Sequence, residues 1–157
     1  MTALRTVPQA EMTASQLASP ELWRLLTTRS FSFHDALNVL SDVKYAAEMG
    51  RLIGRIEAEA APCGTQEVIR HLTPLVTLYG LPNRSEAEWR TFWQFYANAL
   101  GDLPSEAVRR GVEDYVNAPD SEFFPRPGPL KQLCLKRAET ILMAWGRIRK
   151  AYAGGNT

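Results

Sequence analysis

The stretch SEAEWRTFWQFYANALGDLPSEAVRRGVEDYVNAPDSEFFPRPGPLKQLCL, residues 85–135, decides the fold of this chain. Ser85 and Glu88 have the spacing of a capping box, in which each residue satisfies a backbone N–H at a helix start. Apolar residues then recur at steps of three and four: Trp89, Phe92, Trp93, Tyr96 and Leu100. Gly101 is a helix stop signal, and Pro104 suits the first turn of a second helix. The stretch therefore predicts two amphipathic helices joined by a tight turn.

A proline-rich segment follows the second helix. Residues 120–129, DSEFFPRPGP, contain three prolines, which lack a backbone donor and push the preceding residue to extended angles. We therefore expect a stiff, non-helical strap, with the last helix beginning at Pro129. Two interpretations stay open. Either Phe123 and Phe124 both plug the core, or one is buried while the other is displayed with Arg126 to a partner.

The N-terminal third predicts an arm and two helices. Residues 1–18 are small, polar and aperiodic, which is typical of a flexible arm. Ser19 and Pro20 are suited to the N-cap and first position of a short helix. Ser32 is a suitable N-cap for a longer helix over residues 33–61.

The next helix is interrupted by a proline. Thr65 is the expected N-cap, and the apolar residues continue at helical spacing to Tyr79. Pro74 falls inside this run, so we expect a kink or a restart with Thr73 as a second N-cap.

The last helix carries an apolar seam with heptad spacing. Its members are Cys134, Ala138, Ile141, Trp145, Ile148 and Tyr152. We expect the first half of the seam to pack in the core. For Trp145, Ile148 and Tyr152, core packing and an interface with a second copy or another protein stay open, so a homodimer through this helix is one possibility.

These elements predict an all-α fold, a compact bundle of five or six helices with a proline-rich strap before the last helix. No segment alternates with a period of two for long enough to indicate a strand. The predicted organisation is a flexible arm over residues 1–18, a single helical domain over 19–153 and a disordered tail over 154–157.

Composition places the chain among ordinary soluble proteins. With 157 residues and 45% hydrophobic content it can bury a core without the help of disulfides or metal ions. Cys63 and Cys134 are far apart and share no metal-ligand spacing, which favours reduced thiols. No stretch reaches the roughly 18 apolar residues of a membrane span, so we expect no membrane contact and a cytoplasmic location.

Residues suited to catalysis are few. His34 and His71 are the only histidines, and we interpret both as structural or surface residues and not as ligands. Glycine-rich phosphate loops and the familiar hydrolase motifs are missing from the sequence. We therefore expect no enzyme, no catalytic residue, no metal and no cofactor.

The last helix also carries positive charge. Between Lys131 and Lys150 there are six basic residues and one acidic residue, a local charge of +5. Such a stripe can neutralise phosphates, and it can equally be a solvated helix face. The candidate nucleic-acid contacts are Lys131, Lys136, Arg147 and Lys150.

The order of these signals resembles small phage and prophage replication proteins of the helicase-loader type. The resemblance covers roughly residues 65–137 and depends on four pieces of sequence: LTPL at 72–75 leading to Tyr79, the aromatic helix from Trp89 to Leu100, LPSEAV at 103–108, and FFPRPGPL at 123–130. An N-terminal extension of some 60 residues and the longer proline segment depart from that pattern. Membership would imply an all-α, non-enzymatic protein that binds the replicative helicase.

Three hypotheses for function follow. The first is an adaptor that binds a host or phage replication protein, a helicase or initiator, and modulates its loading or activity. Its contact residues would be Phe123, Phe124, Arg126, Trp145, Ile148 and Tyr152. The second is direct binding of DNA or another nucleic acid by the basic last helix. The third is a phage-encoded inhibitor that occludes another host enzyme.

Overall fold

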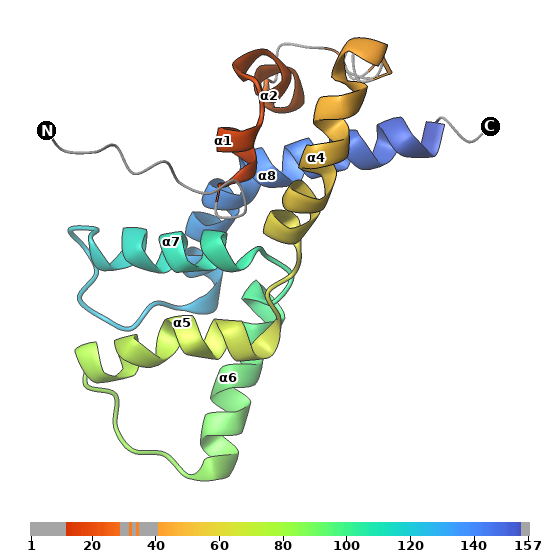
Figure 1. Cartoon of the computed structure of the whole chain (residues 1–157). Coiled ribbons are helices and arrows are strands. Elements are labelled where there is room, and N and C mark those ends of the chain that lie inside the picture. The colour runs from red at the N-terminus through yellow and green to blue at the C-terminus, as the bar shows by residue number, and fades with distance from the viewer. Residues whose placement is uncertain (1–11, 29–31, 33, 35–40, 155–157) are drawn as a thin grey trace, which may run out of the picture. The chain divides into compact units, whose positions relative to one another are not determined.

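The structure is a computed structural model that describes residues 12–28, 32, 34 and 41–154 (Figure 1). The described residues contain seven α-helices and no β-strand, which confirms the all-α fold. The helices are α1 (Ala14–Leu17), α2 (Pro20–Thr27), α4 (Val43–Ala60), α5 (Gly64–Leu78), α6 (Glu86–Leu100), α7 (Ser105–Val116) and α8 (Pro127–Gly154). The number exceeds the predicted five or six because α1 forms within the segment expected to be an arm.

Contacts divide the chain into two compact units. Unit 1 comprises Met1–Ala58 and Ile141–Thr157, and unit 2 comprises Glu59–Thr140. The predicted helical domain over residues 19–153 includes parts of both units, and α4 and α8 each contribute residues to both. The predicted tail over 154–157 lies outside the described residues except for Gly154, where α8 ends.

Unit 1 begins with two capped helices. The backbone N–H of Thr13 donates to Gln16 Oε1 over 2.9 Å, closing a capping box at the start of α1. Ser19 is the N-cap of α2, as predicted, and its Oγ accepts from the backbone N–H of Leu22 over 3.3 Å. The core of unit 1 consists of Ala14, Ala18, Leu22, Leu25, Leu26, Tyr45, Met49, Leu52, Ile56, Ala144 and Ile148.

Helix α4 begins later than the sequence predicts. Residues 41 and 42 form a turn, so the predicted helix over 33–61 is wrong at this point, and residues 33 and 35–40 lie outside the described part. Asp42 caps the helix, because its Oδ1 accepts from the backbone N–H of Lys44 over 3.1 Å. Ser32 is exposed and not helical.

Unit 2 is built around α5, which packs against both α6 and α7 (Figure 1). Its core consists of Val68, Leu72, Leu75, Tyr96, Leu100, Leu103, Val108, Val112, Leu130 and Cys134. The capping box at Ser85 and Glu88 forms as predicted: the Ser85 N–H donates to Glu88 Oε2 over 2.7 Å, and the Glu88 N–H donates to Ser85 Oγ over 3.2 Å.

The start of α5 differs from the prediction. Its N-cap is Cys63 and not Thr65, and the chain turns at Gly64 with a φ of 77°, which glycine adopts without strain. The N–H groups of Cys63 and Gly64 donate to the carbonyls of Leu103 and Gly101 over 2.9 and 3.0 Å. The α6–α7 connection thus fixes where α5 begins.

Pro74 does not divide α5. The helix runs unbroken from Gly64 to Leu78, so the predicted restart at Thr73 is wrong. Thr73 Oγ1 instead donates to the Ile69 carbonyl over 2.6 Å, one turn back along the helix.

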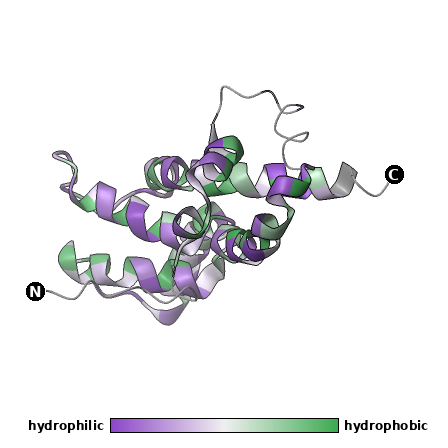
Figure 2. Cartoon of the chain, turned by 45° about the horizontal axis from the view of Figure 1, so that its top comes forward, coloured by the Kyte–Doolittle hydropathy of each residue, from purple (hydrophilic) through white to green (hydrophobic). Residues whose placement is uncertain are grey.

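The helices are amphipathic. Figure 2 shows hydrophobic and hydrophilic residues side by side along the same ribbons, the pattern that buries one face of each helix. Within the described part of the chain, no helix combines the length and hydropathy needed to cross a bilayer.

Candidate functional site

The strap between α7 and α8 is shorter than predicted. Helix α8 begins at Pro127 rather than Pro129, because prolines in a first helical turn lose only donors that a helix start leaves unpaired. The backbone N–H of Leu130 donates to the Arg126 carbonyl over 3.2 Å, which makes Arg126 the residue before the helix. The non-helical strap is therefore residues 121–126, after a turn at 117–120.

Two tyrosine hydroxyls hold the strap. Tyr115 Oη, from α7, donates to the Phe123 carbonyl over 2.7 Å. Tyr96 Oη, from α6, donates to the Pro125 carbonyl over 2.5 Å. Burial raises the pKa of Tyr96 to about 12 and also raises the pKa of Tyr115, so both phenols stay protonated donors at neutral pH.

Phe124 lies between the two residues whose carbonyls accept these hydrogen bonds, and its ring packs inward. Its ring centroid is 5.5 Å from that of Phe92, 5.6 Å from that of Tyr96 and 6.2 Å from that of Tyr79. These edge and tilted contacts join the strap to the aromatic face of α6 and the end of α5.

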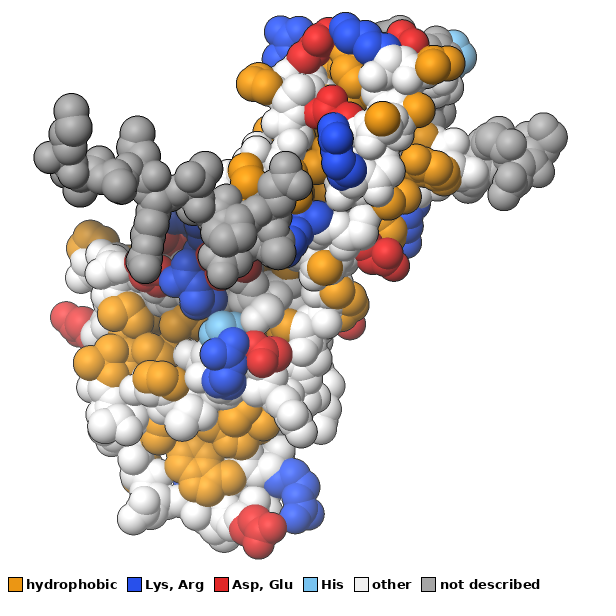
Figure 3. Space-filling model, viewed as in Figure 1, with side chains coloured by type: hydrophobic (Ala, Val, Ile, Leu, Met, Phe, Trp, Pro, Cys, Tyr) orange, Lys and Arg blue, Asp and Glu red, His pale blue; other side chains and the backbone are white. Residues whose placement is uncertain are grey.

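Phe123 is displayed. Its side chain is 76% exposed, whereas Phe124 is half-buried and Arg126 is exposed. The geometry therefore matches the interpretation in which one phenylalanine anchors the strap and the other is presented with Arg126. In Figure 3 hydrophobic side chains gather over the region between α5 and α7 and over the region between α5 and α6. We call Asp120, Glu122, Phe123 and Arg126 the strap surface.

The apolar seam of α8 is mostly structural. Cys134 and Ala138 are fully buried in unit 2, as predicted, and Ile148 is fully buried in unit 1 with Trp145 packed against that core. Tyr152 is the exposed member, at 53%. An interface through the C-terminal part of α8 would therefore depend on Tyr152 and not on Trp145 or Ile148.

The four basic residues predicted to contact nucleic acid lie in different environments. Lys131 and Lys136 are exposed in unit 2, and Lys150 is exposed in unit 1. Arg147 is structural, because its Nη1 donates to the Leu25 carbonyl over 2.7 Å and its Nη2 donates to the Thr28 carbonyl over 2.8 Å. Its guanidinium therefore caps the C-terminal end of α2.

Arg147→Ala is expected to lower the free energy of unfolding by about 2 kcal/mol, because two charged hydrogen bonds are lost and two carbonyls lose their donors. Arg147→Lys should recover only part of this, since an ammonium cannot reproduce the two-pronged fork. The control is Arg149→Ala, whose exposed guanidinium lies 5.7 Å from the Trp145 ring centroid. Urea denaturation measures the cost, and amide exchange should show faster exchange in α2 for Arg147→Ala alone.

A polar network joins α5 to α7, and its one local signal in the sequence, Glu67 one helical turn before His71, was overlooked in the prediction. Ser105 Oγ donates to Glu67 Oε2 over 2.9 Å and lies 2.8 Å from His71 Nε2. Glu67 also pairs with Arg70 over 2.6 Å. Because the serine proton is given to Glu67, the imidazole N–H donates to Ser105 and cannot act as its base. The contacts indicate a structural link and not a nucleophile.

Protonation of His71 is expected to make the folded protein less stable at acidic pH. Burial, aided by Arg70, lowers the pKa of His71 below its usual 6.5. The unfolded chain therefore binds a proton in a range where the folded one does not, so stability is lost as the pH falls through 6.5 towards the folded value. His71→Gln should flatten the dependence of Tm on pH in this range. A His71→Gln protein whose Tm kept the wild-type dependence on pH would show that His71 is not its source.

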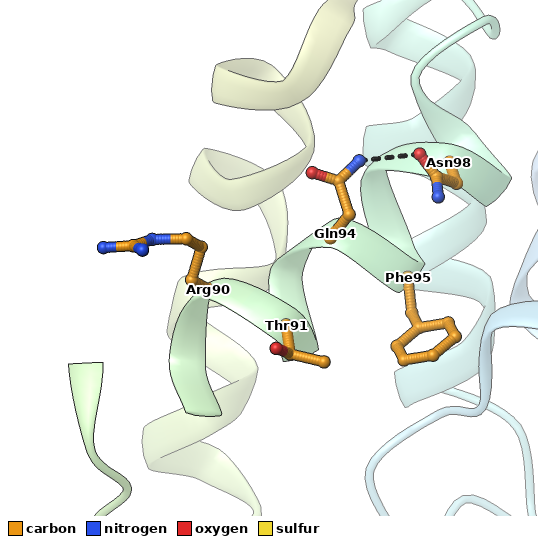
Figure 4. A pocket seen from close by; sticks show the side chains of 5 residues that line it. All are labelled: Arg90, Thr91, Gln94, Phe95 and Asn98. Atoms are coloured by element: carbon orange, nitrogen blue, oxygen red, sulfur yellow. Dashed lines mark hydrogen bonds between the residues drawn. The ribbon is translucent and has the colours of Figure 1, made fainter. Parts of the chain in front are cut away.

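The outer face of α6 is a second surface. Arg90, Thr91, Gln94, Phe95 and Asn98 line a shallow hollow on this one helix (Figure 4). Phe95 is 65% exposed, and Gln94 Nε2 donates to Asn98 Oδ1 over 2.7 Å. The two amides bond to each other along the helix, and Arg90 is the one charged residue among the five that line the hollow. Across the described residues, no group of three or more His, Cys, Asp or Glu side chains is placed to hold a metal ion.

Comparison with known proteins gives no assignment: no family model, no curated protein and no solved structure matches this chain.

Proposed function

We propose that this chain is a non-enzymatic cytoplasmic adaptor that binds a replication protein, the replicative helicase or its loading complex, through the strap surface. The observation that carries the proposal is Phe123, 76% exposed on a segment held by hydrogen bonds from Tyr115 and Tyr96. Aromatic side chains presented in this way are typical anchors of protein interfaces.

The fixed strap favours binding. An exposed ring on a loose loop loses conformational entropy when a partner orders it, whereas a ring on a segment already in place loses less. Here the carbonyls of Phe123 and Pro125 are tied, and the Phe124 ring between them is packed. The backbone around Phe123 is therefore arranged before any partner arrives.

The class of partner comes from the resemblance. It covers roughly residues 65–137, and this range falls within unit 2, the unit that carries the strap. The aromatic helix and the proline segment that carry the resemblance are the elements that Phe124 joins. A helicase or its loader is therefore the first partner to test.

The experiment measures binding of the full chain to the purified replicative helicase of the source organism by interferometry. Phe123→Ala is expected to weaken the complex at least about 30-fold, the scale of a hot-spot residue. Phe95→Ala, which removes an exposed phenylalanine ring from α6 of the same unit, should leave the affinity within about twofold. A wild-type chain that forms no complex with helicase or loader would refute the proposed partner.

Nucleic-acid binding is the alternative, carried by the exposed Lys131 and Lys136. It has less support, because unit 2 holds nine basic and eleven acidic residues, a net charge of −2, and Arg147 caps α2. A mobility shift at low salt that Lys136→Glu abolishes would favour it. The inhibitor hypothesis uses the strap surface too, and only the captured protein distinguishes it from the adaptor.

A further inference from the structure

We infer that the partner site that receives Phe123 is an apolar socket whose rim is basic, with lysine or arginine placed to meet Asp120 and Glu122. The inference rests on the contact function proposed above, but it does not require the partner to be a helicase. It follows from which charges around the strap are already paired within the chain and which are not.

The acids beside Phe123 are unpaired. Asp120 and Glu122 are exposed, and neither makes a hydrogen bond or ion pair with the residues that the structure describes. Glu122 directly precedes Phe123 in the strap, and Asp120 lies in the turn three residues before it. Two free carboxylates therefore accompany the displayed ring.

The acids of the neighbouring helix α7 are used within the chain. Glu106 pairs with Arg109 over 2.7 Å, and Glu113 pairs with the same arginine over 3.1 Å. Asp114 makes two bonds of 2.7 and 2.8 Å to Arg137 of α8. The acidic residues of α7 are thus paired with arginines of the same chain, whereas Asp120 and Glu122 are available to a partner.

Charge complementarity then selects the partner's chemistry. Phe123 is accompanied by two free carboxylates, and unit 2 has a net charge of −2. Binding to an acidic surface or to nucleic acid is therefore disfavoured, since like charges at an interface oppose association. Arg126, three residues beyond Phe123, carries the opposite charge. The basic part of the rim should therefore lie on the side that faces Asp120 and Glu122.

The first test identifies the socket directly. The full chain is expressed in its source organism with the photo-crosslinking amino acid p-benzoylphenylalanine at position 123, and separately at position 95, an exposed phenylalanine of α6 in the same unit. Crosslinked peptides are sequenced by mass spectrometry. The expected result is one partner peptide, specific to position 123, in which apolar residues are flanked by lysine or arginine.

The second test measures the charges, with the purified partner from the crosslink as the probe. Glu122→Lys is expected to weaken binding at least about tenfold at roughly 50 mM salt and much less at roughly 500 mM, where exposed charges are screened within a few ångströms. Asp102→Lys, the same change at an exposed acid at the start of the α6–α7 turn, should change affinity less than about twofold. Glutamate in place of the partner's rim lysine or arginine should restore binding to Glu122→Lys.

The outcomes separate this inference from the proposed partner. A basic-rimmed socket on a helicase or loader supports both, and such a socket on another protein supports the inference while refuting the helicase. A crosslinked site without basic residues, unchanged affinity for Glu122→Lys, or no crosslink specific to position 123 overturns the inference.

Discussion

Gly111→Ala is expected to lower the free energy of unfolding of unit 2 by about 3 kcal/mol, the upper part of the range for overpacked cores. A Cβ at this position would overlap the Cys134 sulfur and lie 2.8 Å from both the Cα and the backbone nitrogen of Cys134. Cβ atoms essentially never approach other atoms within 3.0 Å, so α7 and α8 would have to separate. Loss of this contact would also loosen Val108, Val112 and Leu130, which share the core of unit 2.

Two controls make the test specific. Gly146→Ala lies in α8, the helix of Cys134, with nothing among the described atoms within 4 Å of the new Cβ, and it should raise stability by roughly 0.5–1 kcal/mol because alanine favours a helix. Cys134→Ala combined with Gly111→Ala should rescue little, because the closest remaining atoms belong to the backbone. Urea denaturation followed by tryptophan fluorescence measures all three. A Gly111→Ala protein as stable as the wild type would show that α7 and α8 do not approach this closely.

Local signals in the sequence predicted much of the fold. The N-cap at Ser19, the capping box at Ser85 and Glu88 and the apolar spacing of α6 and α7 all appear in the structure. Each depends on residues three or four positions apart, so the chain encodes them within one helical turn. Where a helix boundary depends on another segment, as at Cys63 and its bond to the Leu103 carbonyl, the local prediction failed.

The contacts that shape the candidate site mostly join residues far apart in the sequence, so patterns over a few neighbouring residues do not predict them. Gly111 stands between an arginine and a valine without any turn signal, and only the crossing with Cys134 explains it. The bond from Tyr96 to the Pro125 carbonyl spans 29 residues, and that from Ser105 to Glu67 spans 38. The prolines of residues 120–129 did predict a non-helical strap. Whether both of its phenylalanines are buried or one is exposed could not be decided from the sequence.

The strap shows why that choice matters for function. Its two phenylalanines have opposite environments: Phe124 contacts rings from α5 and α6, and Phe123 is 76% exposed. The two residues are adjacent in the chain, and the Phe123 carbonyl, held by the Tyr115 hydroxyl, directly precedes the packed Phe124 residue. The anchoring residue and the displayed residue are thus coupled by backbone geometry, and a change at one should be felt at the other.

Phe124→Ala is therefore expected to reduce both stability and partner binding. Deleting a ring with three aromatic neighbours should lower the free energy of unfolding by about 2–3 kcal/mol, less than for a fully buried phenylalanine because Phe124 is half-buried. The strap would then be held mainly by the Tyr96 and Tyr115 hydroxyls, and Phe123 would lose its fixed position. Affinity for the partner should fall although Phe123 itself is unchanged.

Phe123→Ala is the matched control, because it removes the same ring from the neighbouring position. Its effect on unfolding should stay within about 0.5 kcal/mol, as for other exposed sites, while its effect on binding should be at least as large as that of Phe124→Ala. Tyr96→Phe keeps the ring and removes only the bond to Pro125, so its effect on stability should be about 1 kcal/mol. Urea denaturation, amide exchange at residues 121–126 and partner affinity are measured on all three variants. If Phe124→Ala left both stability and affinity at wild-type values, the ring would not anchor the strap, and the preorganised display of Phe123 would have no physical basis.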